Sequence, residues 1–170
     1  MWEMLRTGGV TVSSTDDNIE TFATVAHCHA PEVFDVEGYV YCDPCRVQFE
    51  TKLSHKIAGA TLKLECSDPI TRNVTYSIEG VTDSNGHYKL KVKGDYGDNI
   101  CEVTLNKSPE AECNVPMVGQ QTSRIVCTEN SGMHDSVRYA NALGFMTKDS
   151  ISGCKEVLDE LGLAPKDLDL

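Results

Sequence analysis

Eight cysteines are spread over almost the whole of this 170-residue chain, and they constrain its fold more than any other feature. They stand at positions 28, 42, 45, 66, 101, 113, 127 and 154. A cytosolic domain seldom carries so many without a metal or redox use, whereas secreted domains use them as disulfides. Two of them occur together in Cys42-Asp43-Pro44-Cys45. This motif has three interpretations: a redox centre, half of a zinc site, or two anchors for distant disulfides.

The redox interpretation rests on the similarity of this motif to the Cys-Gly-Pro-Cys of thioredoxins. That chemistry needs a thiol at the start of a helix in a βαβ unit, where the helix dipole lowers its pKa. The following segment, 48–57, has apolar residues four apart and is compatible with a helix. The first alternative function is therefore a thiol-disulfide oxidoreductase, with Cys42 as the nucleophile and Cys45 as the resolving thiol.

The zinc interpretation needs a second close pair of ligands. The candidate pair lies in His27-Cys28-His29, near the start of the chain, and the sequence has no second Cys-x-x-Cys. The histidines form no catalytic set with a serine and an acid that physical argument can select. We therefore expect no metal site, no cofactor and no catalytic residues.

Alternation of apolar and polar residues predicts an all-β fold. Asn85-Gly86 predicts a hairpin turn, since both residues tolerate positive φ. Near the end, 155–161 predicts a short helix, with Ser152 as its cap and Gly162 as its stop. The expected strands are 33–41, 60–66, 74–82, 87–93, 100–105 and 123–127. No crossover helices separate them, so we expect a disulfide-stapled antiparallel β-sandwich or barrel of about seven strands. In it, Cys66 and Cys101 both point inward, where they can bridge the two sheets.

Three regions are expected along the chain. The composition predicts a disordered tail at 1–32, the β domain at 33–164 and a flexible end at 165–170. Within the tail, 20–28 resembles the end of a secretory signal peptide, although an intact signal is not evident. We expect residues 20–28 to occupy the position at which the signal peptide of a secreted protein would end. Asn73-Val74-Thr75 is an N-glycosylation sequon, which agrees with secretion.

The chain is acidic, with 26 Asp and Glu against 15 Lys and Arg and a formal charge of -11. Phosphate backbones and anionic lipids should repel such a chain, so nucleic acid is not an expected partner. No apolar run predicts a membrane span. Loops 67–74 and 94–99 are the expected recognition surfaces, the second with an exposed Tyr96. The second alternative function is a protease inhibitor with a cleavable bond at Lys107-Ser108.

Several stretches resemble the olive pollen major allergen family, the plant pollen proteins of the Ole e I type, related to anther-specific and extensin-domain proteins. They are VEGYVYCDPCR (36–46), GATLKLEC (59–66), VTDSNGHY (81–88), and the shorter matches at 100–103, 113, 138–141 and 154. Together they cover roughly 31–162. The resemblance implies the pairs Cys42–Cys113, Cys45–Cys154 and Cys66–Cys101 in a secreted, often N-glycosylated β domain.

The resemblance also implies a function. It points to a non-catalytic recognition or structural protein of pollen development, pollen tube growth or the cell wall, and to an allergen. The implied partners are an extracellular receptor-kinase domain or a cell-wall polysaccharide or protein. Cys28 and Cys127 fall outside the implied pairs. We expect Cys127 to be a buried small apolar residue, with a Cys28–Cys127 bridge or an intermolecular bridge as the alternative.

Overall fold

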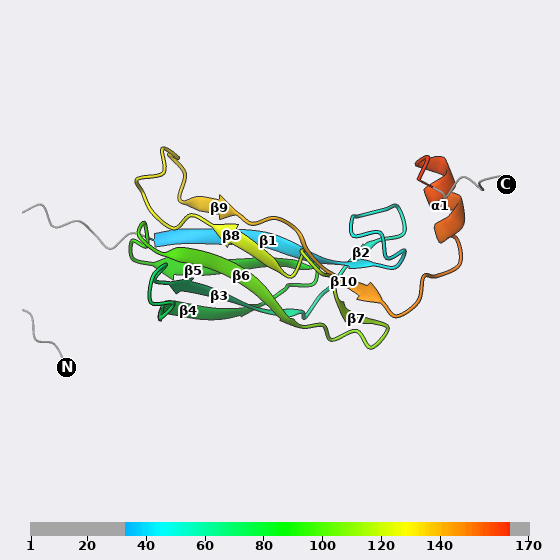
Figure 1. Ribbon diagram of the computed structural model, residues 1–170, viewed down its shortest axis with the longest axis horizontal. Helices are drawn as coiled ribbons and strands as arrows, with labels where there is room; N and C mark the ends of the chain where they lie inside the picture. Colours follow the sequence, from blue (N-terminus) through cyan, green and yellow to red (C-terminus); the bar gives the residue numbers. More distant parts are fainter. Residues whose placement is uncertain (1–32, 164–170) are drawn as a thin grey trace, which may run out of the picture.

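The computed structural model describes residues 33–163, which form ten strands and one short helix. Figure 1 shows an elongated β domain with the helix at one end. The predicted tail 1–32, with Cys28 and the signal-like stretch 20–28, lies outside the described residues, as does the predicted flexible end 165–170. Among residues 33–163, no helix is long and apolar enough to cross a membrane.

The strands form two sheets. The first contains β1 (Val33–Asp43), β2 (His55–Lys56), β5 (His87–Lys93), β7 (Cys113–Pro116), β9 (Val137–Tyr139) and β10 (Leu143–Thr147). The second has the order β4 (Val74–Val81), β3 (Thr61–Ser67), β6 (Ile100–Lys107) and β8 (Thr122–Ile125). The only helix of the described part is α1 (Cys154–Glu160). The all-β prediction is therefore confirmed, with a short helix near the end of the chain.

Strand β1 runs through the whole length of the first sheet (Figure 1). Its first half pairs antiparallel with β5 and parallel with β9. Its second half pairs antiparallel with β2 and parallel with β10. The expectation of a purely antiparallel fold is therefore wrong in the first sheet. The reason is that β9 and β10 return to β1 from far along the chain, where the connection leaves their direction free.

The core lies between the two sheets, and its side chains alternate along each strand as the sequence predicts. In the second sheet, the inward residues of β3 are Leu62, Leu64 and Cys66, and those of β6 are Cys101, Val103 and Leu105. In the first, β5 contributes Tyr88, Leu90 and Val92. All of these side chains are at most 9% exposed. Burial on this scale stabilises the fold by about 1.5–3 kcal/mol for each large apolar side chain.

The predicted hairpin joins β4 to β5. Gly86 has a φ of 74°, and the Asp83 carboxylate accepts hydrogen bonds from the backbone N–H groups of Asn85 at 2.8 Å and His87 at 3.0 Å. These bonds lower the pKa of Asp83, that from His87 most strongly. The turn therefore forms by local chemistry that Asp, Asn and Gly supply.

Two local details differ from what the sequence allowed or predicted. Segment 48–57 is compatible with a helix in sequence but contains none: it holds β2 at 55–56, and Gln48 has a φ of 65°, outside the helical range. Phe49, at its start, is 37% exposed rather than part of a buried face. The predicted helix near the end does form, but its N-cap is Gly153 rather than Ser152, and no side chain caps it. Gly162 follows it with a φ of 69°, as expected of a helix stop.

Candidate recognition surface

Three disulfides join residues that are distant in the chain. They are Cys42–Cys113, Cys45–Cys154 and Cys66–Cys101, with sequence separations of 71, 109 and 35 residues. These are the pairs that the family resemblance implies. The Cys66–Cys101 bridge differs in one respect from the expectation that it joins the two sheets. Cys66 and Cys101 are direct neighbours on β3 and β6, so their bridge lies within one sheet instead of crossing between two.

The Cys42-Asp43-Pro44-Cys45 motif is a turn that anchors two bridges. Asp43 is completely buried, and its carboxylate accepts hydrogen bonds from the backbone N–H groups of Cys45 at 3.0 Å and Gln48 at 2.7 Å. Cys42 and Cys45 are not bonded to each other, since each forms a disulfide with a distant partner. No helix follows the motif to lower a thiol pKa, so the geometry opposes the oxidoreductase alternative. It opposes a zinc site as well, since both sulfurs are in disulfides.

The two predicted recognition loops lie side by side. The hydroxyl of Thr75, at the start of β4, donates to the carbonyl of Cys66 at 3.0 Å and also contacts the side chain of Asn99. Next to it, the rings of Tyr76 and Tyr96 are 5.0 Å apart. Loop 67–74 and loop 94–99 are therefore one surface. The sequence alone predicts the loops but not their contact.

Loop 67–74 is ordered by its own side chains. The Asp68 carboxylate accepts hydrogen bonds from the N–H groups of Thr71 and Ile70 at 2.6 and 2.9 Å, and these bonds lower its pKa. Ile70 is 89% exposed at the tip. Asn73, the predicted glycosylation site, is exposed as well, so a glycan there would extend into solvent.

Loop 94–99 differs from the prediction at Tyr96, which is half-buried rather than exposed. Its hydroxyl donates to the carbonyl of Lys93 at 2.9 Å, and its ring packs against the core. Its backbone N–H donates to the carbonyl of Cys127 at 2.8 Å. Tyr96 therefore holds the loop against the core, while Asp95 and Asp98 remain exposed for contact with a partner.

A third loop, 128–136, completes this surface and was not predicted. Arg138 on β9, 3% exposed, donates to the carbonyl of Thr128 at 3.2 Å and to those of Asp135 and Val137. Its guanidinium lies 4.9 Å from the ring centre of Phe34. One buried arginine thus holds both ends of the loop. The signal for it in the sequence was slight: an Arg within a short run of β-forming residues.

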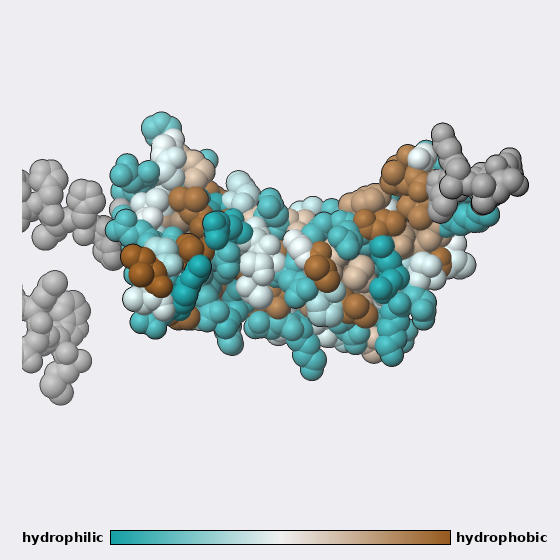
Figure 2. All heavy atoms as spheres, in the orientation of Figure 1, coloured by the Kyte–Doolittle hydropathy of each residue, from teal (hydrophilic) through white to brown (hydrophobic). Residues whose placement is uncertain are grey.

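We call loops 67–74, 94–99 and 128–136 the recognition loops. Between the second and third is a depression of about 450 Å³ lined by Asp95, Gly97, Asp98, Asn99, Thr128 and Asn130. Figure 2 shows hydrophilic residues and small apolar patches side by side at the end of the molecule where the β8–β9 connection lies. Ile70 and Met133 are exposed apolar side chains on these loops. The surface thus combines negative charge with apolar contacts.

The remaining predicted site lies elsewhere. Lys107 ends β6, and the side chain of the next residue, Ser108, is 5% exposed and accepts a hydrogen bond from the N–H of Glu110. A protease inhibitor presents its cleavable bond on a projecting loop, so this position does not favour that alternative. Cys127 is buried, as predicted, and is the one cysteine of residues 33–163 outside a disulfide.

Comparison with known proteins agrees with this geometry. The family model described as "Pollen protein Ole e 1 like" matches residues 32–162. The chain belongs to this family. The Ole e 1 like region thus extends over the whole β domain and ends two residues after α1. The resemblance found in the sequence is confirmed.

Relatives of this Ole e 1 like chain come from several plants. Anther-specific protein LAT52 of Solanum lycopersicum is 56% identical over 147 residues, 86% of this chain and 91% of that protein. Pollen allergen Che a 1 of Chenopodium album is 45% identical, over 76% of this chain and 79% of its own. The crystal structure of the major plantain pollen allergen Pla l 1 matches with a TM-score of 0.64 and 35% identity, covering 72% and 99% of the two chains. These names describe pollen allergens and an anther-specific protein, not enzymes.

Proposed function

We propose that this chain is a secreted, non-catalytic recognition protein of pollen that binds an extracellular receptor-kinase domain through the recognition loops. The carrying observation is that these loops, from three parts of the chain, form one surface held by a disulfide and a buried arginine. Such a rigid surface loses little conformational entropy when it binds. In this role the protein acts in pollen development or pollen tube growth. As a pollen protein of this family, it is also an allergen.

The chemistry of the surface favours a protein over a wall polysaccharide. Asp95 and Asp98 add local negative charge to a chain of formal charge -11, which favours a partner with a basic face. Ile70, 89% exposed, offers an apolar anchor of the kind that fills a pocket on a protein. A cell-wall polysaccharide that carries carboxylates would be repelled by the same charges.

Two parts of this proposal, secretion and glycosylation, follow from the disulfides and the sequon. The bridges need an oxidising compartment to form and persist, which supports secretion. Asn73 is exposed within loop 67–74, so a glycan there would stand on one recognition loop and leave loop 94–99 unmodified. Peptide mapping of protein recovered from plant tissue tests both, together with the mature N-terminus. An unglycosylated Asn73 and reduced thiols would contradict secretion.

The binding proposal is tested with fluorescently labelled protein on germinating pollen tubes. The test variant is Asp95→Asn/Asp98→Asn, which removes two charges from the recognition loops. The control is Glu156→Gln/Asp159→Asn, which removes two charges from α1 at the opposite end of the molecule (Figure 1). We expect the control to label tubes like the wild type and the test variant several-fold less, because loop charges speed association.

Two treatments of the tubes separate the partner classes. Mild protease digestion should abolish labelling if a receptor domain is bound, whereas digestion of wall polysaccharide should leave it. Equal labelling by all three proteins would overturn the choice of surface. Insulin reduction by the wild type, lost in Cys42→Ser, would instead revive the oxidoreductase alternative.

A further inference from the structure

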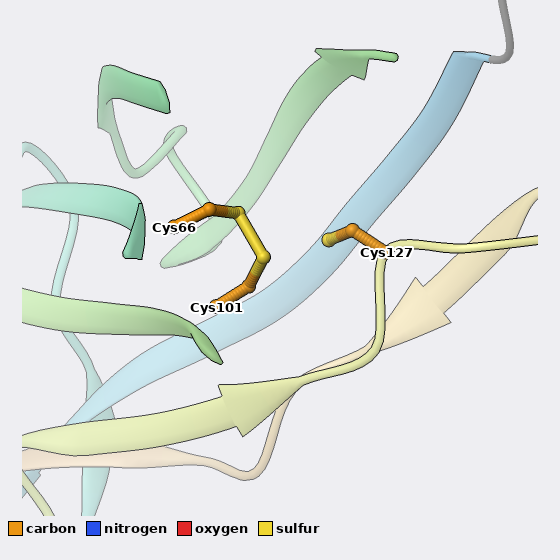
Figure 3. Close-up of side chains that lie close together, drawn as sticks. All are labelled: Cys66, Cys101 and Cys127. Atoms are coloured by element: carbon orange, nitrogen blue, oxygen red, sulfur yellow. A yellow bond between two sulfur atoms is a disulfide. The ribbon is translucent and has the colours of Figure 1, made fainter. Parts of the chain in front are cut away.

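Three buried sulfur atoms lie together beneath the recognition loops (Figure 3). The sulfurs of Cys66, Cys101 and Cys127 are within 4.8 Å of one another, and each residue is at most 1% exposed. Two of them form a disulfide, and the third is a free thiol whose side chain points at that bridge (Figure 3). Thiol-disulfide exchange is therefore within reach of a small movement, with no outside reagent.

The three cysteines stand at the bases of the three recognition loops. Cys66 precedes loop 67–74, Cys101 follows loop 94–99, and Cys127 precedes loop 128–136. The present bridge therefore ties the first loop to the second. A bridge from Cys101 to Cys127 would tie the second loop to the third. Strand pairing favours this product, because Cys101 is the register partner of Ile125, two residues before Cys127.

We propose that Cys127 is an internal exchange thiol that moves the bridge between Cys66–Cys101 and Cys101–Cys127, and thereby selects which recognition loops are joined. The proposal deepens the binding role and rests on it only for its biological meaning. The sulfur chemistry itself stands on the cluster. The reaction is an isomerisation, so the protein keeps one disulfide and one thiol in this cluster before and after it.

Each step of the exchange balances within the cluster. Cys127 gives up its thiol proton, and its sulfur attacks the sulfur of Cys101. The Cys66–Cys101 bond breaks, and its electron pair leaves with the sulfur of Cys66. That thiolate then takes up a proton, equal in number to the one that Cys127 released. Nothing is oxidised or reduced overall.

The surroundings of Cys127 keep the exchange slow in the closed protein. Burial raises the pKa of Cys127 to about 11, and the positive charge of Arg138 on β9 opposes this rise. Tyr96, from loop 94–99, is the other titratable group that faces the thiol. At pH 7 the attacking thiolate is therefore roughly one part in ten thousand of the thiol. The exchange rate should rise about tenfold with each pH unit until the thiol is ionised.

The experiment maps disulfides in the folded full chain after incubation between pH 7 and pH 10. Acid quenching, alkylation of free thiols and peptide mass spectrometry report the bridges, while circular dichroism confirms that the protein stays folded. We expect alkylation to shift from Cys127 to Cys66 and a Cys101–Cys127 peptide to appear, faster at higher pH. A bridge from Cys127 to Cys66 instead would overturn the proposed product, because the sulfur of Cys66 and not that of Cys101 would have been attacked.

Two controls keep the test decisive. Cys127→Ser should show only Cys66–Cys101 at every pH, and Cys66→Ala, folded in a buffer with oxidised glutathione as the oxidant, should form the Cys101–Cys127 bridge. The same mapping in denaturant shows that scrambled bridges are detected. A Cys66–Cys101 bridge that persists unchanged in the folded wild type up to pH 10 would overturn the proposal, as would a Cys28–Cys127 bridge or dimers through Cys127. These readouts use no partner, so they remain separate from the binding test.

Discussion

Gly38 is the residue at which packing most clearly decides the amino acid. A Cβ at this position of β1 would lie 2.4 Å from the hydroxyl oxygen of Tyr88 and 2.7 Å from the adjacent ring carbon. The register between β1 and β5 is continuous here, so Gly38 does not form a bulge. Its role is to leave room for the buried ring of Tyr88.

Gly38→Ala should therefore destabilise the protein by about 1–3 kcal/mol, because the Tyr88 ring must leave its place in the core. The measurement is the free energy of unfolding in urea. Tyr88→Phe removes the hydroxyl that clashes first, so the double variant should lose less stability than the two single losses added together. Strict additivity of the two changes would show that Gly38 serves a purpose other than making room for this ring.

The identities of single residues reveal some of these roles and hide others. Asn85-Gly86 predicts its turn from the sequence alone, because the preference of these residues for positive φ is local. The roles of Asp43 and Arg138 are invisible in sequence, since each depends on which backbone groups the fold brings near it. Tyr96 was expected to be exposed because its neighbours are polar, yet Tyr76 and the Cys127 carbonyl come to it from distant segments.

At the level of elements, the strands that alternate over seven or more residues were predictable. β3 and β5 each bury every second side chain, so a period of two is legible in the sequence. β7, β9 and β10 have three to five residues, too few for a period to show. They exist because β1 and its neighbours supply hydrogen-bond partners, which is a tertiary effect.

The β4–β5 hairpin makes a prediction about acid. Hydrogen bonds from the backbone of His87 and Asn85 hold the pKa of Asp83 below its ordinary value of 3.8. A carboxyl group whose pKa is lowered by folding contributes stability at pH values above its unfolded pKa. That contribution is lost as the pH falls through the lower, folded pKa. Asp83→Asn should therefore flatten the fall in unfolding free energy below about pH 4.

The measurement is urea unfolding at several pH values between 2 and 6. Glu79→Gln is the matched control, since it removes one carboxylate from the exposed face of β4 in the same hairpin. We expect the control to keep the slope of the wild type below pH 4. An Asp83→Asn variant with the same slope would mean that the turn gains nothing from the charged carboxylate.

On the scale of the whole molecule, the disulfides differ in how much of the fold must open before a reductant can reach them. Cys45–Cys154 ties α1 to the turn after β1, and α1 has seven residues, of which only Cys154 and Val157 are buried. A helix of this length is not stable alone, so opening it requires only a local fluctuation. Cys42–Cys113 and Cys66–Cys101 lie on strands of the two sheets, where opening breaks strand pairing.

Cys45–Cys154 should therefore be reduced first. Its reduction rate should exceed that of the other two bridges by about tenfold or more, because local opening needs less free energy than global unfolding. The experiment uses a phosphine reductant at pH 5, where Cys127 stays protonated and cannot exchange. Alkylation and peptide mapping follow each bridge with time, and hydrogen exchange should show α1 freed while both sheets stay protected. In denaturant all three bridges should be reduced at similar rates. Equal rates in the native protein would mean that α1 is as firmly held as the sheets, and that the helix end belongs to the same cooperative unit as the recognition end.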